Sequence, residues 1–109
     1  MLVFEDEEGI RTLLQIAFIK QNVRTESSGR AYLSIIQEFD PDVVLLDLNL
    51  PDLNGQLMLQ GIKKHFPRLR VMVMSGGDAL SDIPADVETW AKPFDVIALR
   101  NRVENFLKF

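Results

Sequence analysis

Short apolar runs alternate with longer amphipathic stretches along the whole chain. The apolar runs lie at residues 2–4, 43–46 and 69–74, and two more polar runs lie at residues 23–26 and 89–91. Runs of this length that are rich in β-branched residues are typical of β-strands. The run at 43–46 is continuously apolar, which predicts a central parallel strand that is buried on both faces.

Between and after these runs, apolar residues recur three or four positions apart, which is the spacing of one face of an amphipathic helix. Pro41 and Pro67 would end the second and third of these helices. Ser27 or Ser28 would cap the second helix, and Asp95 would cap the last. The apolar stripes are Ile10, Leu13, Leu14, Ala17 and Phe18; Tyr32, Ile35, Ile36 and Phe39; Met58, Leu59, Ile62 and Phe66; and Val96, Leu99, Val103, Phe106 and Leu107.

The alternation of strand and helix predicts an α/β fold with one parallel sheet and right-handed crossovers. Five such units predict a doubly wound (βα)5 sandwich with the strand order 2-1-3-4-5. One connection departs from this scheme, because residues 78–84 have weak helical periodicity. Gly76 and Gly77 loosen its start, and Pro84 would break a helix. We therefore expect a fourth helix that is very short or missing.

Composition and charge exclude several classes of function. The length of 109 residues fits one domain, and the absence of cysteine excludes disulfides, thiolate metal sites and cysteine nucleophiles. The net charge of −4 and the lack of a basic stripe argue against direct binding of nucleic acid. No apolar run approaches the roughly 20 residues that a membrane span needs. We expect one cytoplasmic domain over residues 1–109, trimmed or excised from a longer protein.

Polar side chains follow the predicted strands at their carboxyl ends, where open parallel sheets bind ligands. Glu5 and Asp6 follow the first strand, Asp47 ends the third, Ser75 ends the fourth, and Lys92 follows the fifth. Strands one and three are neighbours in the predicted order. The three carboxylates are therefore expected to converge on one pocket.

Three carboxylates in one pocket repel each other by about 4 kcal/mol per pair at about 4 Å, so such a cluster favours a bound cation. A ligand set of oxygens alone favours Mg²⁺ first and Mn²⁺ next. An aspartate beside the cation could act as a nucleophile and form an acyl phosphate. The lysine ammonium and the serine hydroxyl would then bind phosphoryl oxygens.

These motifs, in this order, resemble the signature of response-regulator receiver domains of two-component signalling systems. The resemblance covers essentially the whole chain and is carried by Glu5-Asp6, Asp47-Leu48-Asn49-Leu50-Pro51-Asp52-Leu53-Asn54-Gly55, Ser75 and Lys92-Pro93-Phe94. It implies a flavodoxin-like fold and a phosphoryl group carried on Asp47. It also implies a sensor histidine kinase or histidine phosphotransfer protein as donor, and an output domain or partner protein. A homodimer through the last helix is a further expectation.

The resemblance also implies roles in metal binding. Asp6 and Asp47 would ligate Mg²⁺ directly, and Glu5 would do so directly or through water. Asn49 would contribute its backbone carbonyl.

The remaining implied roles concern phosphoryl binding and switching. Ser75 would bind the phosphoryl group and move with it, and Lys92 would pair with Asp47 or its phosphate. Pro93 would follow a cis peptide bond. Trp90 would occupy the aromatic switch position and turn into the space that Ser75 leaves.

Two departures from the family pattern keep an alternative open. Glu5 stands where aspartate is usual, and the fourth helical segment is short. A degenerate receiver, acting as an interaction module without phosphorylation, would explain both.

A phosphatase of the haloacid dehalogenase type is a weaker alternative, because such enzymes require Asp-x-Asp and this chain has Asp47-Leu48-Asn49. A flavodoxin is weaker again, since the acidic first loop would repel a phosphate. We expect self-phosphorylation and self-dephosphorylation, and no enzyme that acts on an external substrate.

Overall fold

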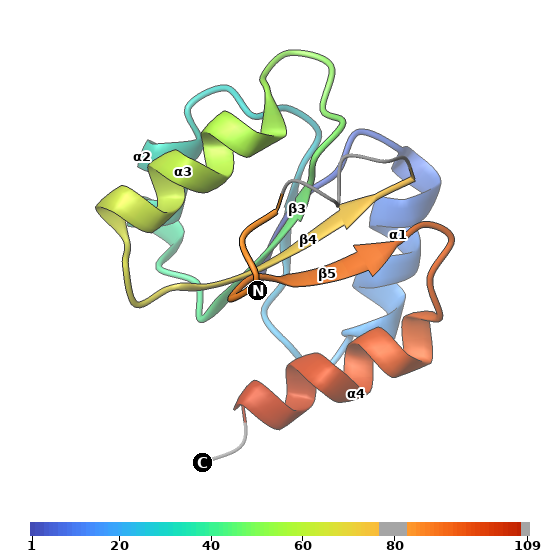
Figure 1. The fold of residues 1–109 in the computed structure, drawn as a ribbon. Helices are drawn as coiled ribbons and strands as arrows, with labels where there is room; N and C mark the ends of the chain where they lie inside the picture. Colours follow the sequence, from blue (N-terminus) through green and yellow to red (C-terminus); the bar gives the residue numbers. More distant parts are fainter. Residues whose placement is uncertain (77–82, 108–109) are drawn as a thin grey trace.

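Five parallel strands form a single sheet in the order β2-β1-β3-β4-β5 (Figure 1). The computed structural model describes residues 1–76 and 83–107. The strands are β1 (Leu2–Phe4), β2 (Arg24–Glu26), β3 (Val43–Asp47), β4 (Arg70–Ser75) and β5 (Glu88–Ala91). Every strand pairing is parallel, so the predicted strand order and orientation are both confirmed.

Four helices cover the two faces of this sheet (Figure 1). They are α1 (Glu8–Ala17), α2 (Tyr32–Phe39), α3 (Gly55–His65) and α4 (Val96–Leu107). Apolar residues of α2 and α3 pack in one core cluster, and those of α1 and α4 pack in the other. The fold is therefore the predicted doubly wound sandwich. Within the described part of the chain, no helix is both long and apolar enough to cross a membrane.

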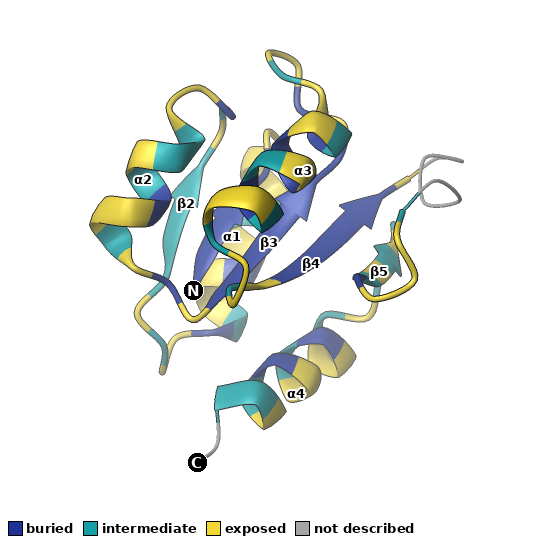
Figure 2. Cartoon of the chain, turned by 60° about the vertical axis from the view of Figure 1, so that its left-hand side comes forward, coloured by how far each residue is buried: buried dark blue, intermediate teal, exposed yellow. Residues whose placement is uncertain are grey.

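The central strand β3 contributes to both cores because successive side chains of a strand point to opposite faces. Val44 and Leu46 pack in the α2–α3 core, and Val43 and Leu45 pack in the α1–α4 core. All five residues of β3 are buried, as the dark blue strand in Figure 2 shows. Burying one such aliphatic side chain stabilises the fold by about 1.5–3 kcal/mol, so β3 anchors the sheet.

The helix caps agree with prediction at one helix and differ at another. Asp95 accepts hydrogen bonds from the backbone N–H groups of residues 97 and 98 and so caps α4, as predicted. The predicted cap of α2 by Ser27 or Ser28 is wrong, because Ala31 occupies that position with a φ of 61°. Ser28 instead donates its hydroxyl to Asp52 Oδ2 at 2.5 Å.

The connection between β4 and β5 contains no helix in its described part, residues 83–87. Ile83 and Val87 pack against the α2–α3 core. Lys63 Nζ of α3 lies 2.7 Å from Asp86 Oδ2 and ties the connection to that helix. The prediction for residues 78–82 lies outside the described residues.

Candidate functional site

Three polar side chains are buried where parallel strands end at one edge of the sheet. Glu5, Asp47 and Ser75 are 0%, 1% and 1% exposed, and they are the buried polar or charged side chains in the described residues. Glu5 follows β1, Asp47 ends β3 and Ser75 ends β4. The register of the parallel strands thus brings together residues that lie far apart in the sequence.

The ammonium of Lys92 lies between two of these buried side chains. Its Nζ is 3.1 Å from Asp47 Oδ2 and 2.7 Å from Glu5 Oε1. The backbone N–H of Lys92 donates to Ser75 O at 2.9 Å, which continues the pairing of β4 and β5. The peptide bond between Lys92 and Pro93 is cis, as expected. The Lys92 ammonium therefore offsets the cost of burying the carboxyl groups of Glu5 and Asp47 at this edge of the sheet.

Asn49 makes contacts that the sequence does not indicate. Its backbone N–H donates to Asp47 Oδ1 at 2.9 Å, and its side-chain Nδ2 donates to Ser75 Oγ at 3.1 Å. The sequence predicts only a backbone carbonyl contribution from Asn49. Its position two residues after the aspartate is visible in the sequence, but the direction of its side chain depends on the turn that follows β3.

Burial and charge pairing set the ionisation of these groups. Burial raises the pKa of Glu5 to about 7, although its contact with Lys92 opposes this. Burial also acts to raise the pKa of Asp47, but the Asn49 N–H, Glu5 and Lys92 together bring that pKa below its ordinary value. The pKa of Lys92 is raised, because its two carboxylate partners outweigh the effect of burial. Asp47 is therefore a carboxylate beside an ammonium near neutral pH.

Oxygen atoms of Glu5, Asp6 and Asp47 lie within 4.8 Å of one another. This spacing and the all-oxygen donor set fit a hard divalent cation. Glu5 already uses both oxygens, since Oε1 contacts Lys92 and Oε2 accepts from the Glu7 N–H at 3.2 Å. Asp47 likewise uses both oxygens, since Oδ1 accepts from the Asn49 N–H and Oδ2 contacts Lys92, whereas the carboxylate of Asp6 is exposed.

The predicted exchange between Ser75 and Trp90 is wrong in the form that the sequence suggests. Trp90 pairs with Met74 in the β4–β5 register, and both pack in the α1–α4 core. Ser75 is the next residue of β4, so its side chain points to the opposite face of the sheet. Trp90 cannot enter space that Ser75 leaves. In the same register, Ala91 is the residue of β5 that lies beside Ser75.

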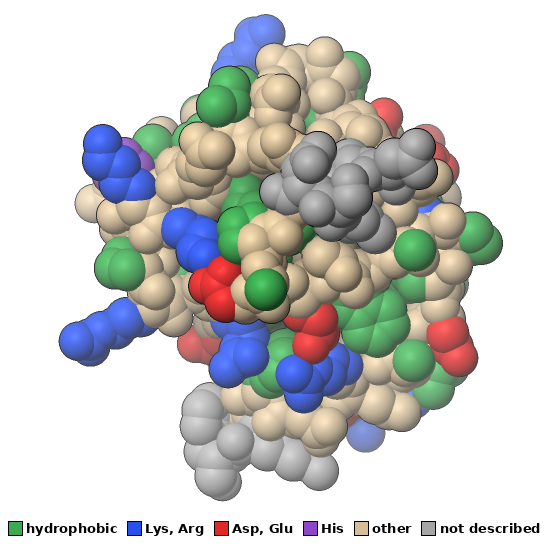
Figure 3. All heavy atoms as spheres, in the orientation of Figure 1, with side chains coloured by type: hydrophobic (Ala, Val, Ile, Leu, Met, Phe, Trp, Pro, Cys, Tyr) green, Lys and Arg blue, Asp and Glu red, His purple; other side chains and the backbone are tan. Residues whose placement is uncertain are grey.

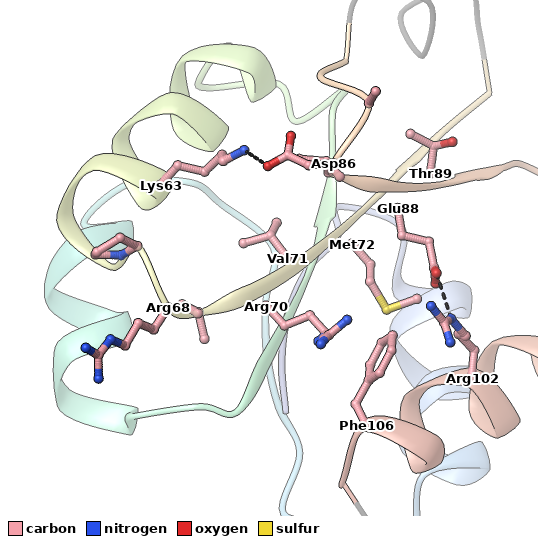
Figure 4. A pocket seen from close by; sticks show the side chains of 14 residues that line it. Lys63, Arg68, Arg70, Val71, Met72, Asp86, Glu88, Thr89, Arg102 and Phe106 are labelled. Atoms are coloured by element: carbon pink, nitrogen blue, oxygen red, sulfur yellow. Dashed lines mark hydrogen bonds and ion pairs between the residues drawn. The ribbon is translucent and has the colours of Figure 1, made fainter.

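A groove of about 680 Å³ lies at the opposite edge of the sheet, near the starts of β4 and β5. Basic and acidic side chains mix on this face (Figure 3). Two ion pairs border the groove, Lys63 with Asp86 and Arg102 with Glu88, each at 2.7 Å (Figure 4). None of the predicted site residues lines this groove, so its salt bridges are a feature separate from the carboxylate site.

Comparison with known proteins agrees with this geometry. Residues 1–104 match the family model for the response regulator receiver domain. Sporulation initiation phosphotransferase F of Bacillus subtilis is 32% identical, and the alignment covers 98% of this chain and 92% of that protein. The regulatory protein AtoC of Escherichia coli is 30% identical over 99% of this chain, which spans 25% of AtoC.

Solved structures give the same result. The receiver domain of NtrX from Brucella abortus superposes with a TM-score of 0.84 at 31% identity, covering 97% of this chain and 96% of that one. The BeF3-activated DrrB receiver domain superposes with a TM-score of 0.83 at 28% identity, over 97% of this chain and 94% of that chain. The chain belongs to the family of response regulator receiver domains.

Proposed function

We propose that residues 1–109 form one receiver domain that accepts a phosphoryl group on Asp47 and switches conformation to control an output. The donor would be a sensor histidine kinase or a histidine phosphotransfer protein. The observation that carries this proposal is the contact of a buried Asp47 carboxylate with the Lys92 ammonium, 3.1 Å away, beside the hydroxyl of Ser75 at the same sheet edge. A degenerate receiver is not supported, because all three residues of the phosphoryl site are in place.

The residues of the site have distinct parts in the transfer. A carboxylate oxygen of Asp47 attacks phosphorus, the new O–P bond forms, and the P–N bond of the donor phosphohistidine breaks with its electron pair left on the imidazole. The Lys92 ammonium stabilises the negative phosphoryl oxygens, and the Ser75 hydroxyl donates to one of them. The side-chain amide of Asn49, which holds Ser75 Oγ at 3.1 Å, orients that hydroxyl. Attack of water on phosphorus would later return the free carboxylate.

We propose that this chemistry uses Mg²⁺, or Mn²⁺ in its place. Asp6 and Asp47 would hold the ion directly, Asn49 through its backbone carbonyl, and Glu5 through water. When bound, the ion would shield the negative charge that builds up between carboxylate and phosphoryl group.

Exposed apolar side chains suggest where the phosphoryl donor docks. Leu13 and Ile16 of α1 are 44% and 64% exposed, and Ile97 at the start of α4 is 49% exposed. Apolar residues of both helices pack on the same face of the sheet, and each helix follows the carboxyl end of a strand, the edge at which Asp47 ends β3. We propose that these exposed apolar side chains contribute to the surface on which the donor docks. A cytoplasmic location, a homodimer through α4 and an attached output domain stay predictions.

Incubation with acetyl phosphate and MgCl₂, followed by intact-protein mass spectrometry, tests the proposal. The expected product carries one phosphate that is labile to hydroxylamine, and Asp47→Asn should abolish it. The matched variant Asp52→Asn, five residues along the same loop, should still be modified. Absence of any modification in the folded wild-type protein would favour the degenerate receiver.

A further inference from the structure

The side chain of Arg11 contacts the backbone of the loop that carries the acidic pair, in addition to the bond from the Glu7 N–H to Glu5 Oε2. Nη1 of Arg11, in α1, donates to the backbone carbonyl oxygens of Glu5 at 2.9 Å and of Asp6 at 2.8 Å. The start of the same loop is fixed independently, because the Glu5 N–H donates to Glu26 O of β2 at 2.9 Å. Arg11 therefore restrains two consecutive peptide groups, and the second of them belongs to Asp6.

Asp6 depends on this restraint more than its neighbours in the site do. Glu5 and Asp47 are buried and contact Lys92 directly, so their side chains are held by their own partners. Asp6 is exposed, and within the described residues no hydrogen bond or ion pair holds its carboxylate. The direction of that carboxylate is thus governed by its backbone, which Arg11 holds through two carbonyls and Glu5 Oε2 holds through the Glu7 N–H.

We propose that Arg11 is a positioning residue for the divalent-metal site: it orients Asp6 toward Asp47 by holding the carbonyls of the loop. The inference rests on the proposed function, since it assumes that Asp6 and Asp47 ligate the ion. It concerns a residue outside the ligand set, and it assigns that residue a role in metal affinity.

The charge of Arg11 has an effect opposite to that of its position. A guanidinium close to the site repels a divalent cation, so loss of the charge alone would strengthen metal binding. Loss of the two hydrogen bonds would free the loop, and the ion would then have to order Asp6 at an entropic cost, which weakens binding. The sign of the change in affinity therefore distinguishes positioning from simple charge.

Titration of MgCl₂ into wild-type protein and into Arg11→Gln and Arg11→Lys, followed by isothermal calorimetry, measures that sign. We expect Arg11→Gln to raise the Kd for magnesium about fivefold or more, the scale of one lost hydrogen bond. Arg11→Lys keeps the charge but not the reach of the guanidinium, so its Kd for magnesium should lie between those of the wild type and Arg11→Gln. Arg68→Gln removes an exposed arginine at the far edge of the sheet and should leave the Kd unchanged.

Thermal unfolding of each variant separates the site from general stability. An unchanged or lower Kd in a folded Arg11→Gln protein would overturn the inference and leave the proposed function intact. If Arg11→Gln does not fold, Arg11→Lys decides alone, because a wild-type Kd in that variant would equally overturn it. A wild-type protein without saturable magnesium binding would overturn the proposed metal site and this inference together.

Discussion

Lys92 is the residue on which the electrostatics of the site depend. Its ammonium lies 2.7 Å and 3.1 Å from the carboxyl groups of Glu5 and Asp47, which are almost completely buried. A buried charge that loses its partner is far more costly than an exposed one, because no water replaces the lost interaction. The same ammonium therefore has two roles, one in holding the unphosphorylated site together and one in receiving the phosphoryl group.

Replacement of Lys92 by methionine should lower the free energy of unfolding by about 3 kcal/mol at neutral pH, because Glu5 and Asp47 then lose their common cation. Urea denaturation in metal-free buffer measures this loss. The double variant with Glu5→Gln should recover part of it, since one buried carboxylate is gone.

The control is Lys63→Met, which breaks the partly exposed ion pair with Asp86 and should cost about 1 kcal/mol or less. Equal losses from the two lysine variants would mean that burial does not set the cost of removing the cation.

At the scale of elements, apolar periodicity predicted the strands and the four helices, and the alternation of strand and helix predicted the strand order. The predicted apolar stripes face the two cores, except for Leu13, which is 44% exposed. The meeting of Asp47 with Glu5, Ser75 and Lys92 also followed from strand ends in a parallel sheet. The predicted cap of α2 was wrong because the helix begins at Tyr32, with Ala31 at the cap position. Ser28 lies before that point, where its Oγ accepts from the Arg30 N–H and donates to Asp52, an acceptor that only the folded loops bring near.

The error at Trp90 has a different cause, because it arises from the pairing of two strands. Side chains alternate between the faces of a strand, and Trp90 lies beside Met74 while Ser75 is one residue further along β4. Strand register, which the sequence left undetermined, decides this point. The direction of the Asn49 side chain and the hydrogen bonds of Arg11 to its loop also depend on turn geometry, which apolar periodicity does not specify.

The turn into α3 requires a glycine at residue 55. A Cβ on Gly55 would lie 2.5 Å from Leu48 Cα and 2.6 Å from Leu48 O, and backbone atoms cannot move aside cheaply. Gly55→Ala should therefore destabilise the protein by about 1–3 kcal/mol, as overpacking does.

The matched control is Gly9→Ala in α1, where a Cβ would meet nothing within 4 Å. That variant should be neutral or more stable by up to about 1 kcal/mol, because alanine favours the helix. Thermal unfolding of both variants checks the pair, and a stable Gly55→Ala protein would disprove the close approach to Leu48.

The loops that follow β2 and β3 are joined through Asp52, which accepts from Ser28 Oγ at 2.5 Å and from the Gly29 N–H at 3.1 Å. The hydrogen bond from Ser28 lowers the pKa of Asp52 below its ordinary value of 3.8, with that from Gly29 second. A lowered folded-state pKa gives stability that is present above pH 3.8 and is lost as the pH falls through the folded-state value. Melting temperatures of wild type and Asp52→Asn should thus differ near neutral pH and converge in acid. A constant difference down to the acid limit would contradict this linkage.

At the scale of the whole molecule, Ser75 and Trp90 lie on opposite faces of the sheet and therefore have different neighbours. Ser75 faces the side covered by α2 and α3, where Val87 and Ile83 of the short connection also pack. Trp90 faces α4, and its indole Nε1 donates to Glu88 Oε2 at 3.1 Å. A movement of Ser75 would therefore reach the β4–β5 connection first, and the α4 face only through the strands.

Addition of beryllofluoride and MgCl₂ to the uniformly ¹⁵N-labelled protein should test this direction of transmission. We expect the largest amide shifts, outside the site itself, at Ala91 and Val87, because these residues share the face of Ser75. The indole N–H of Trp90 should shift less, since Glu88 holds it and Arg102 Nε holds Glu88 at 2.7 Å. The chain contains one tryptophan, so the indole resonance is unambiguous.

The variant Trp90→Phe should keep the shifts at Ala91, because the expected path does not pass through the indole. A large indole shift with Ala91 unmoved would instead mean that the signal crosses to the α4 face directly.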